Sequence, residues 1–144
     1  MNSIIEIADS LINTVKESSD FESVKFLKAY NEKDYNPSHE GITAVVDLDT
    51  IEKGNSYISG LFKFDTVGEV YLADLTLRVY AGDSVSGDSL TCECIRLKDA
   101  VLSADSEGYI VKSKISPIRY ESTTAAVYRE ITFEIEYVLC EAAV

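Results

Sequence analysis

The chain has 144 residues, of which 46% are hydrophobic and 26% are charged. These proportions are typical of a globular domain and exclude a disordered or fibrous chain. No apolar run approaches the roughly 18 residues that span a bilayer. The opening Met-Asn-Ser-Ile-Ile-Glu also lacks the basic start of a secretory signal. We therefore expect one domain over residues 1–144.

The charge balance is strongly acidic, with 25 Asp and Glu against 13 Lys and Arg and a formal net charge of −12. Binding to nucleic-acid phosphates requires clustered Lys and Arg, and so does attraction to an anionic membrane. The composition therefore argues against both partners. It leaves open a partner with basic patches, or a surface that lets DNA pass without binding it. The three cysteines and the absence of a signal favour reduced, free thiols.

The first half of the chain predicts one helix followed by strands. Apolar residues recur at helical spacing near the start: Ile4, Ala8, Leu11 and Val15. A strand is expected at 24–30, a polar loop at 31–41 and a second strand at 42–48. Residues 49–55, which contain Gly54, are typical of a hairpin tip. The chain is then expected to return as strands at 57–64 and 69–81.

The second half predicts a helix and two long strands. Helical spacing continues from residue 90 to Gly108, with apolar positions Leu90, Cys94, Leu97 and Val101. Strands are expected at 109–120, where Pro117 indicates an edge or a bulge, and at 127–140. The expected fold is α+β, in the order helix, four strands, helix, two strands. It has a mostly antiparallel sheet of about six strands, with two helices packed on one face.

Residues with catalytic or metal-binding chemistry are few. His39 is the single histidine, and it lies in a polar loop without a nucleophile motif. Cys92 and Cys94 are two apart on a predicted helix, so they point away from each other and fit small core residues better than metal ligands. Asp47 and Asp49 share a strand face that a divalent cation could use, although a solvated hairpin shoulder explains them better. We expect no catalytic, metal or cofactor site, and no enzyme.

Acidic residues recur on one side of the last predicted strand. Glu130, Glu134 and Glu136 alternate with apolar residues, which predicts an outward acidic face. A solvated face explains the spacing, and an acidic channel or docking face is the functional alternative. Nine tyrosines and no tryptophan lean mildly towards a protein interface.

The order of the elements resembles that of tail terminator (tail completion) proteins of tailed phages and their relatives in contractile phage-tail-like bacteriocins. The opening Ile4–Leu11 looks like their start. The stretch Ile118-Arg119-Tyr120, followed by Tyr128 to Tyr137, looks like their closing turn and aromatic last strand. The resemblance covers nearly the whole chain but rests on layout, because no segment is a diagnostic motif.

The resemblance implies a structural protein without cofactors. Such proteins form a six-fold ring that stops growth of the tail tube and docks the head connector or the last sheath ring. The implied partners are further copies of the chain, the tube protein, and a connector or sheath protein. The implied location is a virion or phage-tail-like particle assembled in the bacterial cytoplasm. An acidic channel would repel passing DNA.

Two further interpretations stay open beside this one. The first is a tail tube or neck protein of related fold, and the second is a small ligand-binding α+β domain acting as a monomer or dimer. For a ring, our hypothesis is that the 42–64 hairpin packs against a neighbouring subunit or the tube. Its apolar residues are too many for a one-sided sheet: Tyr57, Ile58, Leu61, Phe62 and Phe64.

Overall fold

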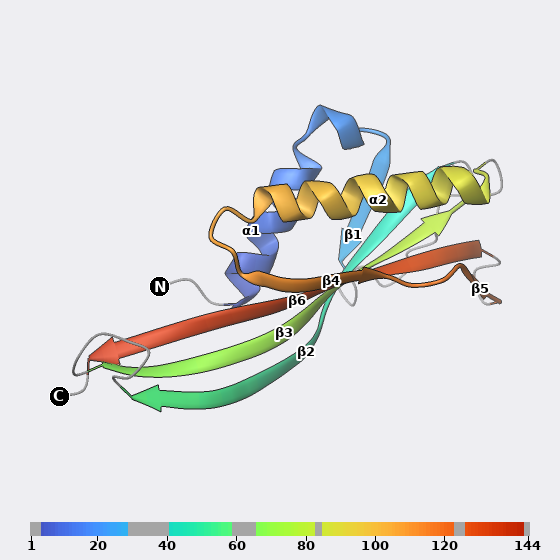
Figure 1. Cartoon of the computed structure of the whole chain (residues 1–144). Helices are drawn as coiled ribbons and strands as arrows, with labels where there is room; N and C mark the ends of the chain where they lie inside the picture. The colour runs from blue at the N-terminus through green and yellow to red at the C-terminus, as the bar shows by residue number, and fades with distance from the viewer. Residues whose placement is uncertain (1–3, 29–40, 59–65, 83–84, 123–125, 143–144) are drawn as a thin grey trace.

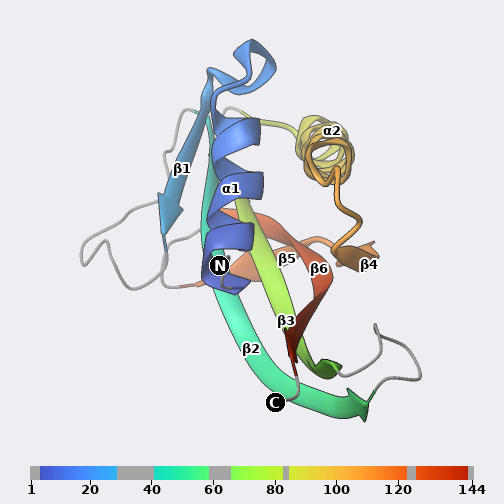
Figure 2. The same cartoon turned by 90° about the vertical axis from the view of Figure 1, so that its left-hand side faces the viewer.

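The computed structural model describes residues 4–28, 41–58, 66–82, 85–122 and 126–142, and at 49–50, 52–58, 66–69 and 138–142 it describes the backbone only. Within these residues the six strands form one sheet, and the two α-helices lie on one side of it (Figures 1 and 2). In chain order the elements are α1 (Ile4–Lys16), a 3-10 helix (Ser19–Phe21), β1 (Val24–Lys28), β2 (Ile42–Ile58), β3 (Thr66–Ala81), α2 (Gly87–Ala104), β4 (Ile110–Ile115), β5 (Arg119–Glu121) and β6 (Ala126–Ala142).

The sheet has the strand order β1-β2-β3-β6-β4, and β5 also pairs with β6. All pairs are antiparallel except β1 with β2. The predicted α+β class, the mostly antiparallel sheet and the two helices on one face are therefore confirmed. Figure 2 shows α1 lying over the β2 side of the sheet and α2 lying towards the β4 side.

The core lies between the helices and the inner face of the sheet. Each helix buries one apolar stripe at helical spacing, as Leu11 of α1 and Leu97 of α2 illustrate. From the sheet side, Leu75, Leu77 and Phe133 are completely buried beneath them. Because these strand residues are two apart or directly opposite across β3 and β6, alternation alone places them on the same face.

The predicted hairpin tip at 49–55 is wrong. Residues 42–58 form one continuous strand, β2, which pairs with β3. The pairing changes register between Leu48 and Ile51 and again between Lys53 and Ser56. The turn-forming residues that suggested a hairpin, Gly54 among them, are therefore accommodated at irregularities within a strand. The predicted separate strand at 57–64 is also wrong at 57–58, which end β2, and the rest of it lies outside the described residues.

The predicted closing pair of strands is three strands. The expected strand at 109–120 is interrupted at 116–118, so that β4 and β5 pair one after the other with β6. Pro117 stands in this interruption, as its missing N–H and the edge position of the segment predict. The last strand is a single element and extends two residues beyond the predicted end at 140.

Strands β2, β3 and β6 are much longer than the layer of helices above them. They have 17, 16 and 17 residues, about three times the usual strand length. Figure 1 shows their far ends continuing past α1 and α2 as a curved three-stranded extension. The β6–β4 pairing stops at Ile135, so this extension has β2 at one edge and β6 at the other.

Candidate functional site

The sheet face opposite the helices carries most of the polar residues of the central strands. The register of β3 and β6 places Arg78 opposite Glu130, Thr76 opposite Thr132, and Asp74 opposite Glu134. These positions alternate with the buried core residues, so they point to the other side of the sheet. We call this side the helix-free face. The three acids singled out in the sequence, Glu130, Glu134 and Glu136, are all partly buried there.

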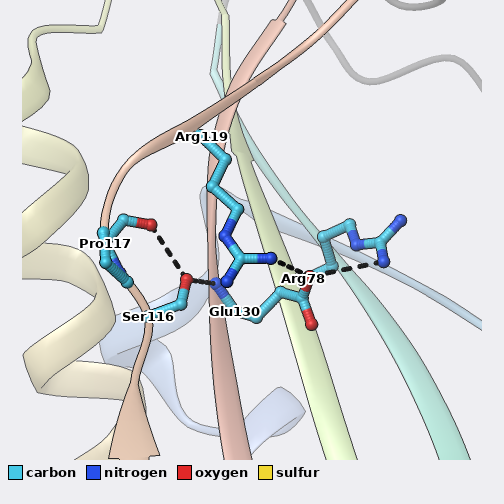
Figure 3. Close-up of polar contacts among 5 residues, drawn as sticks. All are labelled: Arg78, Ser116, Pro117, Arg119 and Glu130. Carbon is cyan, nitrogen blue, oxygen red and sulfur yellow. Dashed lines mark hydrogen bonds and ion pairs between the residues drawn. The ribbon is translucent and has the colours of Figure 1, made fainter.

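Glu130 lies between two arginines (Figure 3). The Arg78 guanidinium Nη2 donates to its carboxylate Oε1 at 3.4 Å, and Nη1 of Arg119 stands 3.9 Å from the same oxygen. Arg78 also lies over the ring of Tyr128, 5.1 Å from its centroid, a distance suited to a cation–π contact. Two positively charged arginine side chains therefore lie beside the Glu130 carboxylate and offset its negative charge.

The bend between β4 and β5 is fixed to β6 beside this cluster. The Ser116 hydroxyl accepts a hydrogen bond from the Glu130 N–H at 2.9 Å and donates to the Pro117 carbonyl at 2.9 Å (Figure 3). The Ser116 N–H donates to the Glu130 carbonyl at 2.8 Å. Arg129, on the opposite side of β6, donates from Nη1 to the Ser116 carbonyl at 2.8 Å. These bonds set the position of the end of β4.

Glu134 stands between an acid and a base. It is directly opposite Asp74 on β3 and Lys112 on β4. A shallow polar depression of about 230 Å³ lies over this row, lined by Asp74, Lys112, Ser113, Lys114, Thr132 and Glu134. Two carboxylates and two ammonium groups balance one another in charge. Asp74 and Glu134 are cross-strand neighbours of like charge, and the two lysines that line the same depression bring the net charge of this row to zero.

Several stretches of strand edge lack a partner strand within the described part of the chain: the outer edges of β1, β4 and β5, the end of β6, and β2 beyond its pairing with β1. Strand β1 pairs with β2 only up to Val46, and no described strand pairs with that edge of β2 further along. At the other end of the sheet, β4 pairs with β6 on one side alone. Unpaired strand edges present rows of free N–H and C=O groups to a second chain.

A groove accompanies the open edge of β2. It has a volume of about 260 Å³ and is mostly apolar, with Ile5, Ala8 and Asp9 from α1, Lys28 from β1, Val46, Asp47, Leu48 and Ile51 from β2, and Leu75 from β3. Asp9 and Lys28 form an ion pair of 3.1 Å at its rim. Ile5 and Ile51 are 55% and 50% exposed, so this edge leaves large apolar side chains in contact with water.

Several residues singled out in the sequence cannot be placed at this surface. Tyr57 and Ile58 end β2, but their side chains are not described; Leu61, Phe62 and Phe64 lie outside the described residues, as does His39. Asp47 is within β2 rather than on a hairpin shoulder, so that expectation is wrong. Cys92 is exposed and Cys94 is buried, and burial raises the pKa of the Cys94 thiol to about 11.

The basic residues of the helix-free face were not singled out in the sequence. Lys112 and Lys114 are exposed and occupy alternate positions of β4, and Arg78 and Arg119 flank Glu130. The alternation Lys112-Ser113-Lys114 is a readable signal of a basic strand face. Which acidic residues these lysines lie beside depends on the order of the strands in the sheet, and alternation within one strand does not reveal that order.

No group of three or more His, Cys, Asp and Glu in the described ranges is arranged to hold a metal ion. Within the same ranges, no helix has the length and apolar character needed to cross a membrane. In comparisons with known proteins, no family model and no curated protein matches this chain.

Proposed function

We propose that this chain is a structural protein that assembles with copies of itself into a closed ring, and that the ring caps the head-proximal end of a phage or phage-like tail tube. The observation that carries the self-assembly part is that β2 beyond Val46 and the outer side of β4 are among the strand edges without a partner in the described residues. Monomeric proteins commonly protect such edges, because they pair readily with another chain.

The two edges differ in sequence and lie at opposite ends of the sheet. A contact between them is therefore heterologous: one patch of a subunit meets a different patch of its neighbour. Heterologous contacts close into a ring when the rotation between subunits divides a full turn, and otherwise they form open filaments. This arrangement supports a ring more than a simple two-fold dimer.

The tail assignment rests on the resemblance in layout described for the sequence. A terminator ring stops addition of tube subunits and offers its other side to a head connector or to the last sheath ring. The acidic composition, with a net charge of −12, supports this role because a negatively charged channel does not retain DNA. The particle would form in the bacterial cytoplasm.

A tail tube or neck protein of related fold is the second candidate, and the same two edges support it. A tube protein polymerises without limit, whereas a terminator stops at one ring. A small ligand-binding domain is the third candidate, supported by the groove beside β2, and it remains a monomer or dimer.

Size-exclusion chromatography with light scattering, followed by negative-stain electron microscopy, tests this proposal on the purified chain. Closed rings of one subunit number support it. Tubes of variable length favour the second candidate, and a monomer or dimer across a concentration series overturns the ring.

A further inference from the structure

We propose that the helix layer is a docking surface for a partner protein, and that a groove between α1 and the end of α2 receives a segment of that partner carrying lysine or arginine side chains. The helix layer is defined as residues 4–22 and 87–109, which contain both α-helices and the turn after α2. The inference goes beyond the proposed function, because the groove lies within a single chain. In a ring built through strand edges, this layer is left for the next component of the particle.

Acidic charge is concentrated in the helix layer. It has five acidic residues and one basic residue over 4–22, and five acidic and two basic residues over 87–109. The strands, by contrast, have six acidic and seven basic residues among the side chains that the structure describes. The two layers of the molecule therefore differ strongly in charge. A surface dominated by one sign of charge favours partners of the opposite sign and disfavours those of its own sign.

A groove of about 560 Å³ opens between the two helices at one end of this layer, and we call it the helix groove. The carboxylates of Glu6, Asp105 and Glu107 line it, and no described lysine or arginine does. Its apolar lining includes Ile7 and Leu11, which are nearly fully buried. A lysine or arginine has an apolar stem and a charged end. Its stem can therefore cover these apolar residues while its charge reaches the carboxylates.

The end of α2 adds negative potential to the helix groove. The last turn of α2 has no basic residue, whereas α1 has Lys16 in its last turn. A helix C-terminus has a partial negative charge that favours nearby cations. The Asp105 carboxylate is held beside it, since Oδ1 accepts from the Tyr109 N–H at 2.9 Å and Oδ2 accepts from the Ile110 N–H at 2.8 Å. These two bonds fix the orientation of this carboxylate in the groove.

The helix groove suits separate cationic side chains better than a single metal ion or a nucleic acid. Within the described residues, no three acidic, cysteine or histidine side chains are grouped to hold an ion. Nucleic-acid phosphates are repelled by the acidic layer. A protein segment with spaced lysines or arginines supplies both separated positive charges and apolar contact.

A second copy of this chain is a poorer occupant than a different protein. Basic side chains of the sheet lie beside acids of the same chain: Arg78 and Arg119 flank Glu130, and Lys112 stands opposite Glu134. The sheet therefore does not offer the strongly basic surface that complements the helix layer. We assign the groove to a partner protein with a positively charged segment.

Binding of a model peptide tests this assignment. The probe is a fluorescently labelled octapeptide of alternating lysine and leucine, and the same peptide with glutamate in place of lysine is its control. Fluorescence anisotropy measures affinity at about 0.15 M salt, where charges more than about 8 Å apart are largely screened. We expect the lysine peptide to bind the wild-type chain and the glutamate peptide not to bind. A lysine peptide that does not bind overturns the inference.

Two charge reversals locate the binding. Glu107→Lys changes an exposed residue in the helix groove. Glu22→Lys makes the same change in net charge at an exposed residue of the helix layer that does not line the groove. We expect the first variant to weaken binding of the lysine peptide by about tenfold, and the second by less than about twofold. Equal losses would show that net charge alone attracts the peptide and would overturn the groove assignment.

A change of shape tests the groove without a change of charge. Ser10 is exposed and lines the groove, so Ser10→Trp fills space that the segment needs, while Ser10→Ala leaves it open. We expect the tryptophan variant to keep its circular dichroism spectrum and lose peptide binding, and the alanine variant to bind normally. Unchanged binding in a folded tryptophan variant contradicts the assignment.

The outcomes separate this inference from the proposed ring. A chain that binds the peptide in the groove but stays monomeric supports the inference and overturns the ring. Rings that form normally and do not bind the peptide overturn the inference and leave the ring intact. If Glu107→Lys weakens assembly of the chain with itself, a second copy occupies the groove, which contradicts the assignment to a partner protein.

Discussion

Arg78 and Glu130 face each other across β3 and β6, and the guanidinium Nη2 donates to the carboxylate Oε1 at 3.4 Å on the side of the sheet away from the helices. The side chain of Glu130 is 23% exposed, against 40% for that of Arg78. A partly buried carboxylate between two guanidinium groups contributes more than an ordinary surface pair, because it also compensates their mutual repulsion.

Removing the charge of Glu130 is therefore expected to destabilise the fold. Glu130→Gln leaves Arg78 and Arg119 near an uncharged amide and should lower the free energy of unfolding by about 0.5–1.5 kcal/mol. Glu136→Gln is the matched control, because it changes net charge equally on the same strand and Glu136 has no ion pair among the described contacts. Urea denaturation measures both variants. Equal losses of unfolding free energy in the two variants would show that the change in net charge, and not the loss of the ion pairs of Glu130, causes the destabilisation.

The turn between α2 and β4 depends on Gly108, which has φ = 76°. A residue with a Cβ is disfavoured in this left-handed conformation by about 1–2 kcal/mol. We expect Gly108→Ala to destabilise the protein by that amount, although there is open space for the methyl group. Gly87→Ala is the control: its Cβ meets Ile118 Cδ1 at an ordinary 3.6 Å. Thermal denaturation should show this second variant unchanged or slightly more stable.

The two cysteines of α2 should differ sharply in reactivity. Cys92 is exposed, whereas Cys94 is buried and its thiol has a pKa raised to about 11. Because the thiolate is the nucleophile, iodoacetamide at pH 8 should alkylate Cys92 in the folded protein and Cys94 only after unfolding. Peptide mass spectrometry distinguishes the two sites. Equal rates at both sites in the folded protein would contradict the buried position of Cys94.

The same shift predicts a dependence of stability on pH. The folded state favours the neutral Cys94 thiol, so its raised pKa contributes stability that is complete below the ordinary thiol pKa of about 8.5. That contribution is lost as the pH rises through about 11. Cys94→Ser should reduce the loss of stability between pH 8 and pH 10. An unchanged pH profile in that variant would show that other groups cause the loss.

The core contribution of α2 can be tested with two leucines of the same helix. Leu97 is completely buried and Leu102 is 37% exposed. We expect Leu97→Ala to cost about 2–5 kcal/mol of unfolding free energy, because it leaves a cavity between α2 and the sheet. Leu102→Ala should change it by less than about 0.5 kcal/mol in the monomer. Chemical denaturation of both variants measures the contrast, and similar losses would contradict the burial of Leu97 against the sheet.

The sequence predicted the elements whose periodicity is unbroken. The spacing of apolar residues predicts both helices and the strands β3 and β6. In each of these elements the apolar residues recur on one side, which is the buried side in the structure, as Leu97 and Phe133 illustrate. The length of β2 could not be read in this way. Gly54 belongs to the residue types that form turns, and only pairing with the long β3 strand holds the chain extended through it.

The candidate surface could be predicted only in part. Alternation placed Glu130 and Glu134 on one face, but their matching bases come from β3, β4 and β5, which are distant in sequence. Arg129 breaks the apolar alternation of β6 and points to the helix side. Its role, donation to the Ser116 carbonyl, depends on the break in the chain after β4.

Whether the chain forms a ring is decided by the state of assembly of the purified, unaltered protein, determined by light scattering and negative-stain electron microscopy. We expect closed rings of a single subunit number, six by the resemblance to tail terminators, that do not grow as the protein concentration rises. A chain that stays monomeric at every concentration, or that polymerises into tubes without limit, would contradict this expectation.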